Sequence, residues 1–302
     1  MKHVAVPYDS DEALLGLIVP RVRSALDEGR HVLLITCATK LALLSEALGP
    51  DAGHIDSRIS SAWYGHPYRT LAASHEYTRG RRTLLIGEPP WAGRSEREVR
   101  ELIRYESVVN AALSATAATM FCLYDVRRVP ESVLEFGPVN HPVLLGVDGE
   151  VTSRGFVEPH ELVLNGDRAP LPKPGDDAET IRFTGRELKR LRQSVGDYAR
   201  AAGMDRNLIT SLVISVSEIA ANSVEHGAGY GTIAMWVTDG ELICEIADPG
   251  GALDDPLPGY IPPEPESPRG YGLWISRQLC DLVELRTEGG VLRVRLHLSM
   301  ES

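Results

Sequence analysis

Residues 216–227 read VSEIAANSVEHG, and no other stretch says more about the architecture of the chain. Glu218 and Asn222 are four residues apart in a predicted helix over 205–225, so their side chains project from one helix face. A carboxylate and a carboxamide one turn apart can hold a magnesium ion and orient a hydroxyl group for proton removal. Taken alone, the pair is more typical of an ordinary solvated helix face.

Two glycine-containing motifs follow this helix. Residues 248–251 (DPGG) come where a predicted strand ends, and residues 269–274 (RGYGLW) open a predicted helix. Asp248 at a strand end can accept a hydrogen bond from the exocyclic amine of a base, and Gly250 allows close approach to a flat ring. Glycines before a helix N-terminus expose backbone N–H groups that suit phosphate. Each motif alone is equally typical of a turn or a glycine-assisted helix start.

In this order, the three motifs resemble the Bergerat nucleotide-binding fold of the GHKL superfamily over residues 180–300. The sequence of residues 216–227 is most similar to that of the RsbW-like anti-sigma factor serine kinases. The resemblance implies ATP and Mg²⁺ as cofactors, Glu218 as general base and Asn222 as the magnesium ligand. It assigns Asp248 to adenine recognition, with Gly250 giving close approach. It places the remaining cofactor-binding residues at the phosphates: Arg269, Gly270, Gly272 and Leu273.

Two features depart from the family pattern. Residues 288–291 (EGGV) lack the hydroxyl that the family carries as a threonine after a glycine. The lid region 252–268 contains six prolines, which favour extended conformations over a closing lid. These features favour an alternative in which the nucleotide site is degenerate and the domain only binds partners.

The first half of the chain predicts a different architecture. Short apolar runs that end in polar or turn residues alternate with amphipathic helices over 11–28 and 97–113. This pattern predicts an α/β domain with an open parallel sheet. The predicted strands are 31–36, 83–87, 120–124 and 143–147.

The second half is predicted to be an α+β two-layer sandwich, because its helices are grouped and its strands are mostly antiparallel. We predict helices over 186–202, 205–225 and 271–282, and strands over 179–184, 232–238 and 241–248, before a final strand pair. A stretch rich in proline and acidic residues separates the halves. The predicted domains are therefore 1–160 and 179–302, joined by a linker over 161–178.

Three patches in the first domain suggest a ligand cleft, because ligands bind beyond the carboxyl ends of parallel strands. They are residues 87–94 (GEPPWAGR), 104–110 (RYESVVN) and 122–125 (CLYD), and with His141-Pro142 they resemble the MEDS sensory domain. The resemblance implies sensing of a small organic molecule. Structural ion pairs and core aromatics are the equal alternative. The candidate cleft residues are Glu88, Trp91, Arg94, Glu106, Asn110, Tyr124 and Asp125.

Composition narrows the function further. A net charge of −11 argues against direct nucleic-acid binding, which requires a basic face. No apolar run approaches the roughly 18–20 residues of a membrane span, and the N-terminus lacks a signal-peptide pattern, so we expect a cytoplasmic protein. Four widely spaced cysteines without a CxxC motif predict neither a zinc site nor a disulfide framework.

The leading hypothesis is a cytoplasmic regulator of transcription that binds Mg·ATP and sequesters a sigma factor under control of the sensory domain. Phosphorylation of an anti-sigma antagonist on serine is a further step that the sequence leaves open. The alternative is a non-catalytic partner-binding regulator with a degenerate nucleotide site. Resemblance to the anti-sigma kinases also predicts a homodimer.

Overall fold

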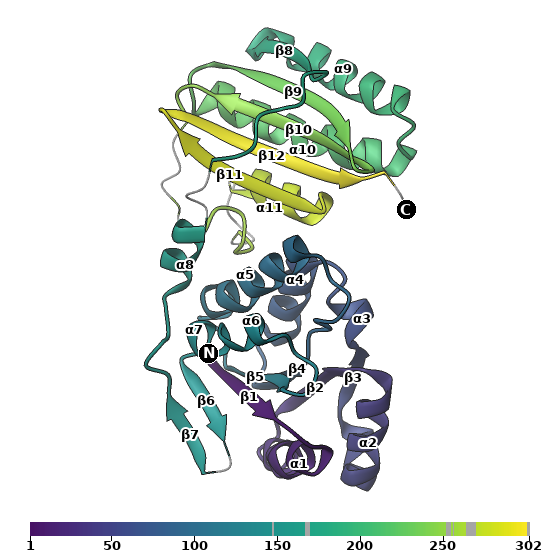
Figure 1. The fold of residues 1–302 in the computed structure, drawn as a ribbon, viewed down its shortest axis with the longest axis vertical. Coiled ribbons are helices and arrows are strands. Elements are labelled where there is room, and N and C mark those ends of the chain that lie inside the picture. The colour runs from purple at the N-terminus through teal and green to yellow at the C-terminus, as the bar shows by residue number, and fades with distance from the viewer. Residues whose placement is uncertain (147, 167–169, 252–254, 256, 264–269, 301–302) are drawn as a thin grey trace. The chain divides into compact units, whose positions relative to one another are not determined.

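The computed structural model divides the chain into two compact units, Met1–Leu162 and Val163–Ser302. It describes residues 1–146, 148–166, 170–251, 255, 257–263 and 270–300, with the backbone alone at 164–166 (Figure 1).

The first unit contains a seven-stranded sheet in the order β3-β2-β4-β5-β1-β6-β7. All neighbouring strands are parallel except β6 and β7. The predicted open α/β sheet is therefore confirmed. The strands are β1 (Lys2–Tyr8), β2 (His31–Thr36), β3 (Asp56–Ile59), β4 (Thr83–Gly87), β5 (Ala118–Asp125), β6 (Val143–Gly146) and β7 (Gly149–Thr152).

Helices alternate with the strands of this sheet along the chain. Ser10 caps α1 by accepting a hydrogen bond from the N–H of Ala13, and Ser95 with Glu98 forms a capping box at α5. Apolar residues of α1 and α2 pack with β1, β2, β4 and β5 in one core cluster. The helices are α1 (Asp11–Asp27), α2 (Ala38–Leu48), η1 (Gly49–His54), α3 (Ser60–Trp63), α4 (Pro67–Thr78), α5 (Glu96–Ala112), α6 (Glu131–Leu134), α7 (Gly137–Asn140) and α8 (Pro159–Gly166).

The second unit is a five-stranded antiparallel sheet in the order β11-β12-β10-β9-β8, with α9, α10 and α11 on one face (Figure 1). Buried residues of α9 and α10 share a core with the inward-facing side chains of the strands, which confirms the predicted two-layer sandwich. The elements are β8 (Glu179–Thr184), η2 (Gly185–Glu187), α9 (Leu188–Ala201), α10 (Arg206–Glu225), β9 (Tyr230–Thr238), β10 (Glu241–Asp248), α11 (Tyr271–Leu279), β11 (Leu282–Glu288) and β12 (Val291–Ser299).

The predicted linker 161–178 is more structured than its composition suggests. It begins inside α8, and its second part is hydrogen-bonded to the sheet of the second unit. The N–H of Leu171 donates to Glu288 Oε1 at 3.0 Å, and Arg295 Nη2 donates to the carbonyl of Pro172 at 2.5 Å. Proline and glycine prevent regular structure here without preventing packing.

Among the described helices, α10 is long and apolar enough by length and composition to cross a membrane. Its apolar residues Leu212, Val216 and Ile219 instead lie in the core of the second unit. The side chain of Glu218 is half-buried on the same helix, and that of Asn222 is exposed. This helix therefore matches a core helix with one polar face, as the sequence pattern predicted.

Candidate functional site

The three motifs of the second unit converge on one pocket. It lies between α10, β10, α11 and β12, with polar groups towards the helix ends and apolar side chains towards the core. The lining residues are Ile219, Asn222, Ser223, His226, Gly227, Ile246, Asp248, Gly251, Leu273, Leu292 and Val294.

The first turn of α11 packs closely on the polar face of α10. A Cβ atom added to Gly272 would lie 3.1 Å from Asn222 Nδ2 and 3.2 Å from Glu218 Oε2. Gly270, the N-cap of α11, has a left-handed φ of 94°, which suits glycine. Glycine at these positions therefore lets the N-terminus of α11 meet Glu218 and Asn222 at one place.

Asp248 lies at the end of β10 and is 4% exposed. Its Oδ1 accepts hydrogen bonds from the N–H groups of Ala228, at 3.1 Å, and Gly250, at 2.9 Å. Its Oδ2 faces two glycines, since an added Cβ would lie 1.8 Å away at Gly227 and 2.9 Å away at Gly251. One carboxylate oxygen is thus fixed by the backbone, and glycines keep side chains away from the other.

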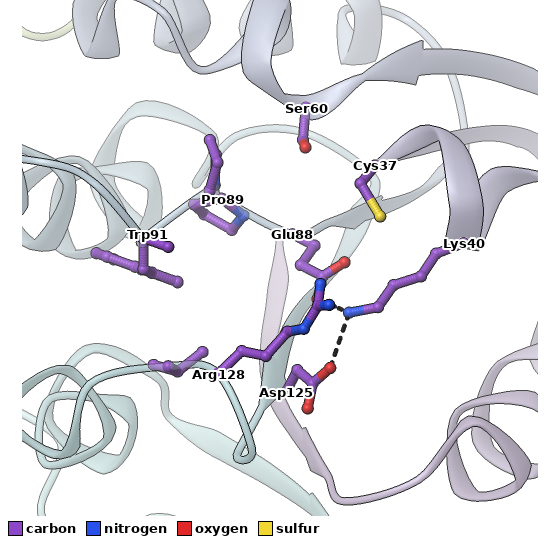
Figure 2. Close-up of a pocket in the computed structure, with 11 residues that line it drawn as sticks. Cys37, Lys40, Ser60, Glu88, Pro89, Trp91, Asp125 and Arg128 are labelled. Atoms are coloured by element: carbon purple, nitrogen blue, oxygen red, sulfur yellow. Dashed lines mark hydrogen bonds and ion pairs between the residues drawn. The ribbon is translucent and has the colours of Figure 1, made fainter.

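The predicted cleft of the first unit contains a buried charge cluster at the carboxyl ends of the strands (Figure 2). Lys40 Nζ donates to Glu88 Oε1 at 2.5 Å and to Asp125 Oδ2 at 3.1 Å. Tyr8 donates to the same oxygen of Glu88 at 2.7 Å, and Thr36 donates to the other. Hydrogen bonds from Arg127 and Lys40 hold the pKa of Asp125 well below its usual range, although burial alone would raise it.

A second cluster of polar side chains lies on the other side of an aromatic pair, Trp91 and Tyr124, whose rings stack with centroids 6.4 Å apart. The edge of Tyr124 meets the ring of His141 at 5.8 Å. His141 Nε2 in turn lies 3.3 Å from Glu106 Oε2. Glu106, which is 1% exposed, therefore lies in the interior and does not line the pocket of Lys40.

Comparison with protein families supports both halves of this description. Residues 2–142 match the MEDS (methanogen/methylotroph, DcmR sensory) domain, and residues 181–297 match the histidine kinase-like ATPase domain. The chain joins a MEDS domain to a histidine kinase-like ATPase domain. Domains of the second type bind ATP, usually with Mg²⁺, and a sensory domain joined to one makes a regulatory signalling protein.

Other comparisons add little to this assignment. The crystal structure of the RsbU and RsbW domains of a Mycobacterium tuberculosis protein matches with 19% sequence identity and a TM-score of 0.31. The match covers 44% of the present chain and 34% of that structure. Curated proteins give no match.

Within the ATPase domain, some of the predicted cofactor-binding residues line the pocket and others do not. Asn222, Asp248 and Leu273 line the pocket, while Gly250 packs on Ala228 and Gly251 is the glycine of the DPGG motif that lines the pocket. Arg269 lies outside the described residues. Sequence reasoning missed the pocket-lining residues that only the fold brings in: Ser223, His226, Gly227 and Leu292.

The described part of the lid region, 257–263, is docked on α11. Arg277 is 1% exposed and donates to the carbonyls of Pro258, at 3.0 Å, and Val283, at 3.1 Å. Its guanidinium also lies 3.7 Å from the ring centroid of Tyr260. Arg277 therefore holds the described part of the lid region on α11. No sequence motif pointed to this role of Arg277.

Within the MEDS domain, the predicted residues separate into two groups. Glu88, Trp91 and Asp125 line the pocket of Lys40, whereas Asn110 contacts His3 beside Glu106. The guanidinium of Arg94 donates to two backbone carbonyls, of Pro90 at 2.7 Å and of Tyr64 at 2.8 Å, so it ties its own loop to the end of α3. Lys40, Tyr8 and His3 were missed, because strand β1 was not predicted and Lys40 stands in no motif.

Proposed function

We propose that the protein is a cytoplasmic anti-sigma regulator. Its ATPase domain would bind Mg·ATP, sequester a sigma factor, and phosphorylate an anti-sigma antagonist on serine. The MEDS domain would control these activities by binding a small organic molecule.

The observation that carries this proposal is the contact of Gly272 with both Glu218 and Asn222. A methyl group at Gly272 would crowd both side chains, so the chain keeps open the place where a helix N-terminus meets a carboxylate and a carboxamide. Backbone N–H groups at such a terminus favour phosphate, and amide and carboxylate oxygens suit Mg²⁺. Asp248 offers a carboxylate oxygen in the pocket that Asn222 also lines.

These residues divide the work of phosphoryl transfer. Asn222 would hold the magnesium ion, and the N-terminus of α11 would bind the phosphates. Glu218 would accept the hydroxyl proton of the partner's serine. The serine oxygen would take the γ-phosphoryl group, with ADP as the leaving group. Mg·ATP supplies the transferred phosphoryl group when bound.

The acidic balance of the chain supports the choice of partner. A net charge of −11 favours encounter with a basic protein, as DNA-binding sigma factors are, while the contact surface sets specificity. The same charge disfavours a direct role on nucleic acid.

Calorimetric titration of Mg·ATP and Mg·ADP into the full chain tests the nucleotide site. We expect micromolar binding that Asn222→Ala abolishes. Transfer of labelled phosphate to a candidate antagonist then tests the kinase step, which Glu218→Gln should remove. Glu225→Gln is the matched control, because this carboxylate lies on the same helix with its side chain 69% exposed, whereas Glu218 lies against Gly272.

A non-catalytic regulator is the second candidate, and the docked base of the lid favours it. Arg277 fixes residues 257–263 on α11, and Leu292 occupies the pocket wall near residues 288–291, where the related kinases carry a threonine. Nucleotide binding without phosphate transfer, together with partner binding, would select this candidate.

A further inference from the structure

Four side chains with metal-ligating atoms converge inside the MEDS domain. They are His3 from β1, Glu106 from α5, Cys122 from β5, and His141 directly after α7. All four residues are 0–1% exposed, and their ligand atoms lie within 4.8 Å of one another. The cluster draws on four segments that are distant in sequence, so it exists only in the folded chain.

The hydrogen-bond partners of His3 fix its tautomer. Asn110 Nδ2 donates to the carbonyls of Ser107, at 3.0 Å, and Asn140, at 2.8 Å, which orients the Asn110 amide. Asn110 Oδ1 therefore faces His3 Nδ1 at 3.1 Å and accepts a hydrogen bond from it, so the proton lies on Nδ1. His3 Nε2 is left to present a lone pair to the cluster.

His141 reaches the same state by a different contact. Its Nδ1 lies 2.9 Å from the carbonyl oxygen of Gly137, and a carbonyl only accepts. The proton therefore sits on Nδ1, and Nε2 points at Glu106. Histidines that bind a metal through one ring nitrogen usually donate a hydrogen bond from the other nitrogen in this way.

The cluster consequently brings acceptors together without enough donors. Neither oxygen of Glu106 has a hydrogen-bond partner among the described residues, and neither does His141 Nε2. The thiol of Cys122 lies 3.1 Å from His3 Nε2. A buried, ionised carboxylate that faces lone pairs and receives no hydrogen bond is strongly unfavourable, so the arrangement calls for a cation.

We propose that His3, Glu106, Cys122 and His141 bind one Zn²⁺ ion in a tetrahedral site. Imidazole, thiolate and carboxylate ligands together suit zinc. Bond lengths of about 2.0–2.3 Å place tetrahedral ligands about 3.3–3.7 Å apart. Three of the six separations are 3.1 Å for His3–Cys122, 3.3 Å for His141–Glu106 and 3.7 Å for His3–Glu106, and none of the six exceeds 4.8 Å.

The site does not depend on the proposed kinase function. Four protein ligands close the coordination sphere, which is the pattern of a structural zinc site. The ion would tie β1, β5 and α5 to the segment after α7, next to the stacked pair Trp91 and Tyr124. Its loss would loosen the wall that these aromatic rings form.

Metal analysis of the purified full chain tests the proposal. We expect one zinc ion per chain, and after chelation we expect one Co²⁺ to bind with a thiolate-to-cobalt charge-transfer band and tetrahedral visible bands. Cys122→Ala should remove the ion and the charge-transfer band. Cys244→Ala is the matched control, because this thiol is also fully buried but lies in the ATPase domain, and it should keep both.

The alternative is a metal-free ion pair between a protonated His141 and Glu106. Nitrogen-15 spectra of the histidine rings separate the two without any mutation, because a metal-bound Nε2 carries no proton and an imidazolium does. Protonated Nε2 at neutral pH, or a wild-type chain that takes up neither Zn²⁺ nor Co²⁺, would overturn the proposal.

Discussion

Gly272 of α11 lies against Asn222 of α10 so closely that a Cβ atom would come within 3.1 Å of the amide nitrogen. Gly272→Ala should therefore displace Asn222 and weaken Mg·ATP binding about tenfold, or about 1.4 kcal/mol. Calorimetric titration of the two proteins measures the change. Gly196→Ala is the control, since its Cβ would make only ordinary contacts, at 3.7 Å from Val213. Equal affinity of both variants for Mg·ATP would contradict the proposal that the phosphates bind at the N-terminus of α11.

Asp248→Asn separates base recognition from folding. The new carboxamide oxygen can still accept from the N–H groups of Ala228 and Gly250, so the melting temperature should change little. Its amide nitrogen would face the adenine amine with a donor, and ATP affinity should fall about 10- to 100-fold, or about 1.4–2.8 kcal/mol. GTP titrated in parallel is the reference. Unchanged ATP binding would mean that Asp248 serves only the backbone.

The outer face of the ATPase sheet contains a buried ion pair. Arg295 Nη2 donates to Glu245 Oε2 at 2.6 Å, and the two residues are directly opposite on β12 and β10. Glu245→Ala should lower the free energy of unfolding by about 3–5 kcal/mol, because it leaves a buried guanidinium without its carboxylate. Asp197→Ala removes an exposed pair with Arg200 and should cost less than about 1 kcal/mol. Urea unfolding of both variants gives the comparison, and similar losses would refute it.

His297 makes the stability of the same face depend on pH. Burial lowers its pKa, but hydrogen bonds to Glu241 and Glu284 outweigh burial and raise the pKa above the ordinary 6.5. The protonated form is thus favoured by folding, so this stabilisation is complete below about pH 6.5 and is lost as the pH rises through the folded pKa. Urea unfolding at about pH 6 and about pH 9 should show the decline, and His297→Gln should reduce it. An equal decline in the variant would assign the effect to other groups.

Local patterns predicted most elements of this fold. The alternation of apolar runs and amphipathic stretches located β2, β4, β5 and β6, and the ExxxN spacing placed Glu218 and Asn222 on one face of α10. Such features depend on neighbours in sequence. Strand β1 was missed although it is central, because polar His3 and Tyr8 bound its short apolar run.

Features that depend on tertiary pairing were less accessible. Cysteine spacing predicted no zinc site, yet Cys122 lies beside His3 because β1 pairs with β5 across more than a hundred residues. Lys40 stands in no motif and becomes central only when β4 and β5 bring Glu88 and Asp125 to it. Sequence spacing alone does not reveal such clusters, because no local period places their members.

The hydrogen bonds of Leu171 and Pro172 decide where a separate ATPase domain should be cut. A fragment starting at Glu179 would lose the acceptor that Pro172 gives to Arg295, and it would lose Gly175, which lies near Trp236. A fragment that starts before Pro170 keeps the hydrogen bonds that Leu171 and Pro172 make to the sheet. Expression work on the isolated domain therefore needs the proline-rich stretch, which composition alone would have discarded.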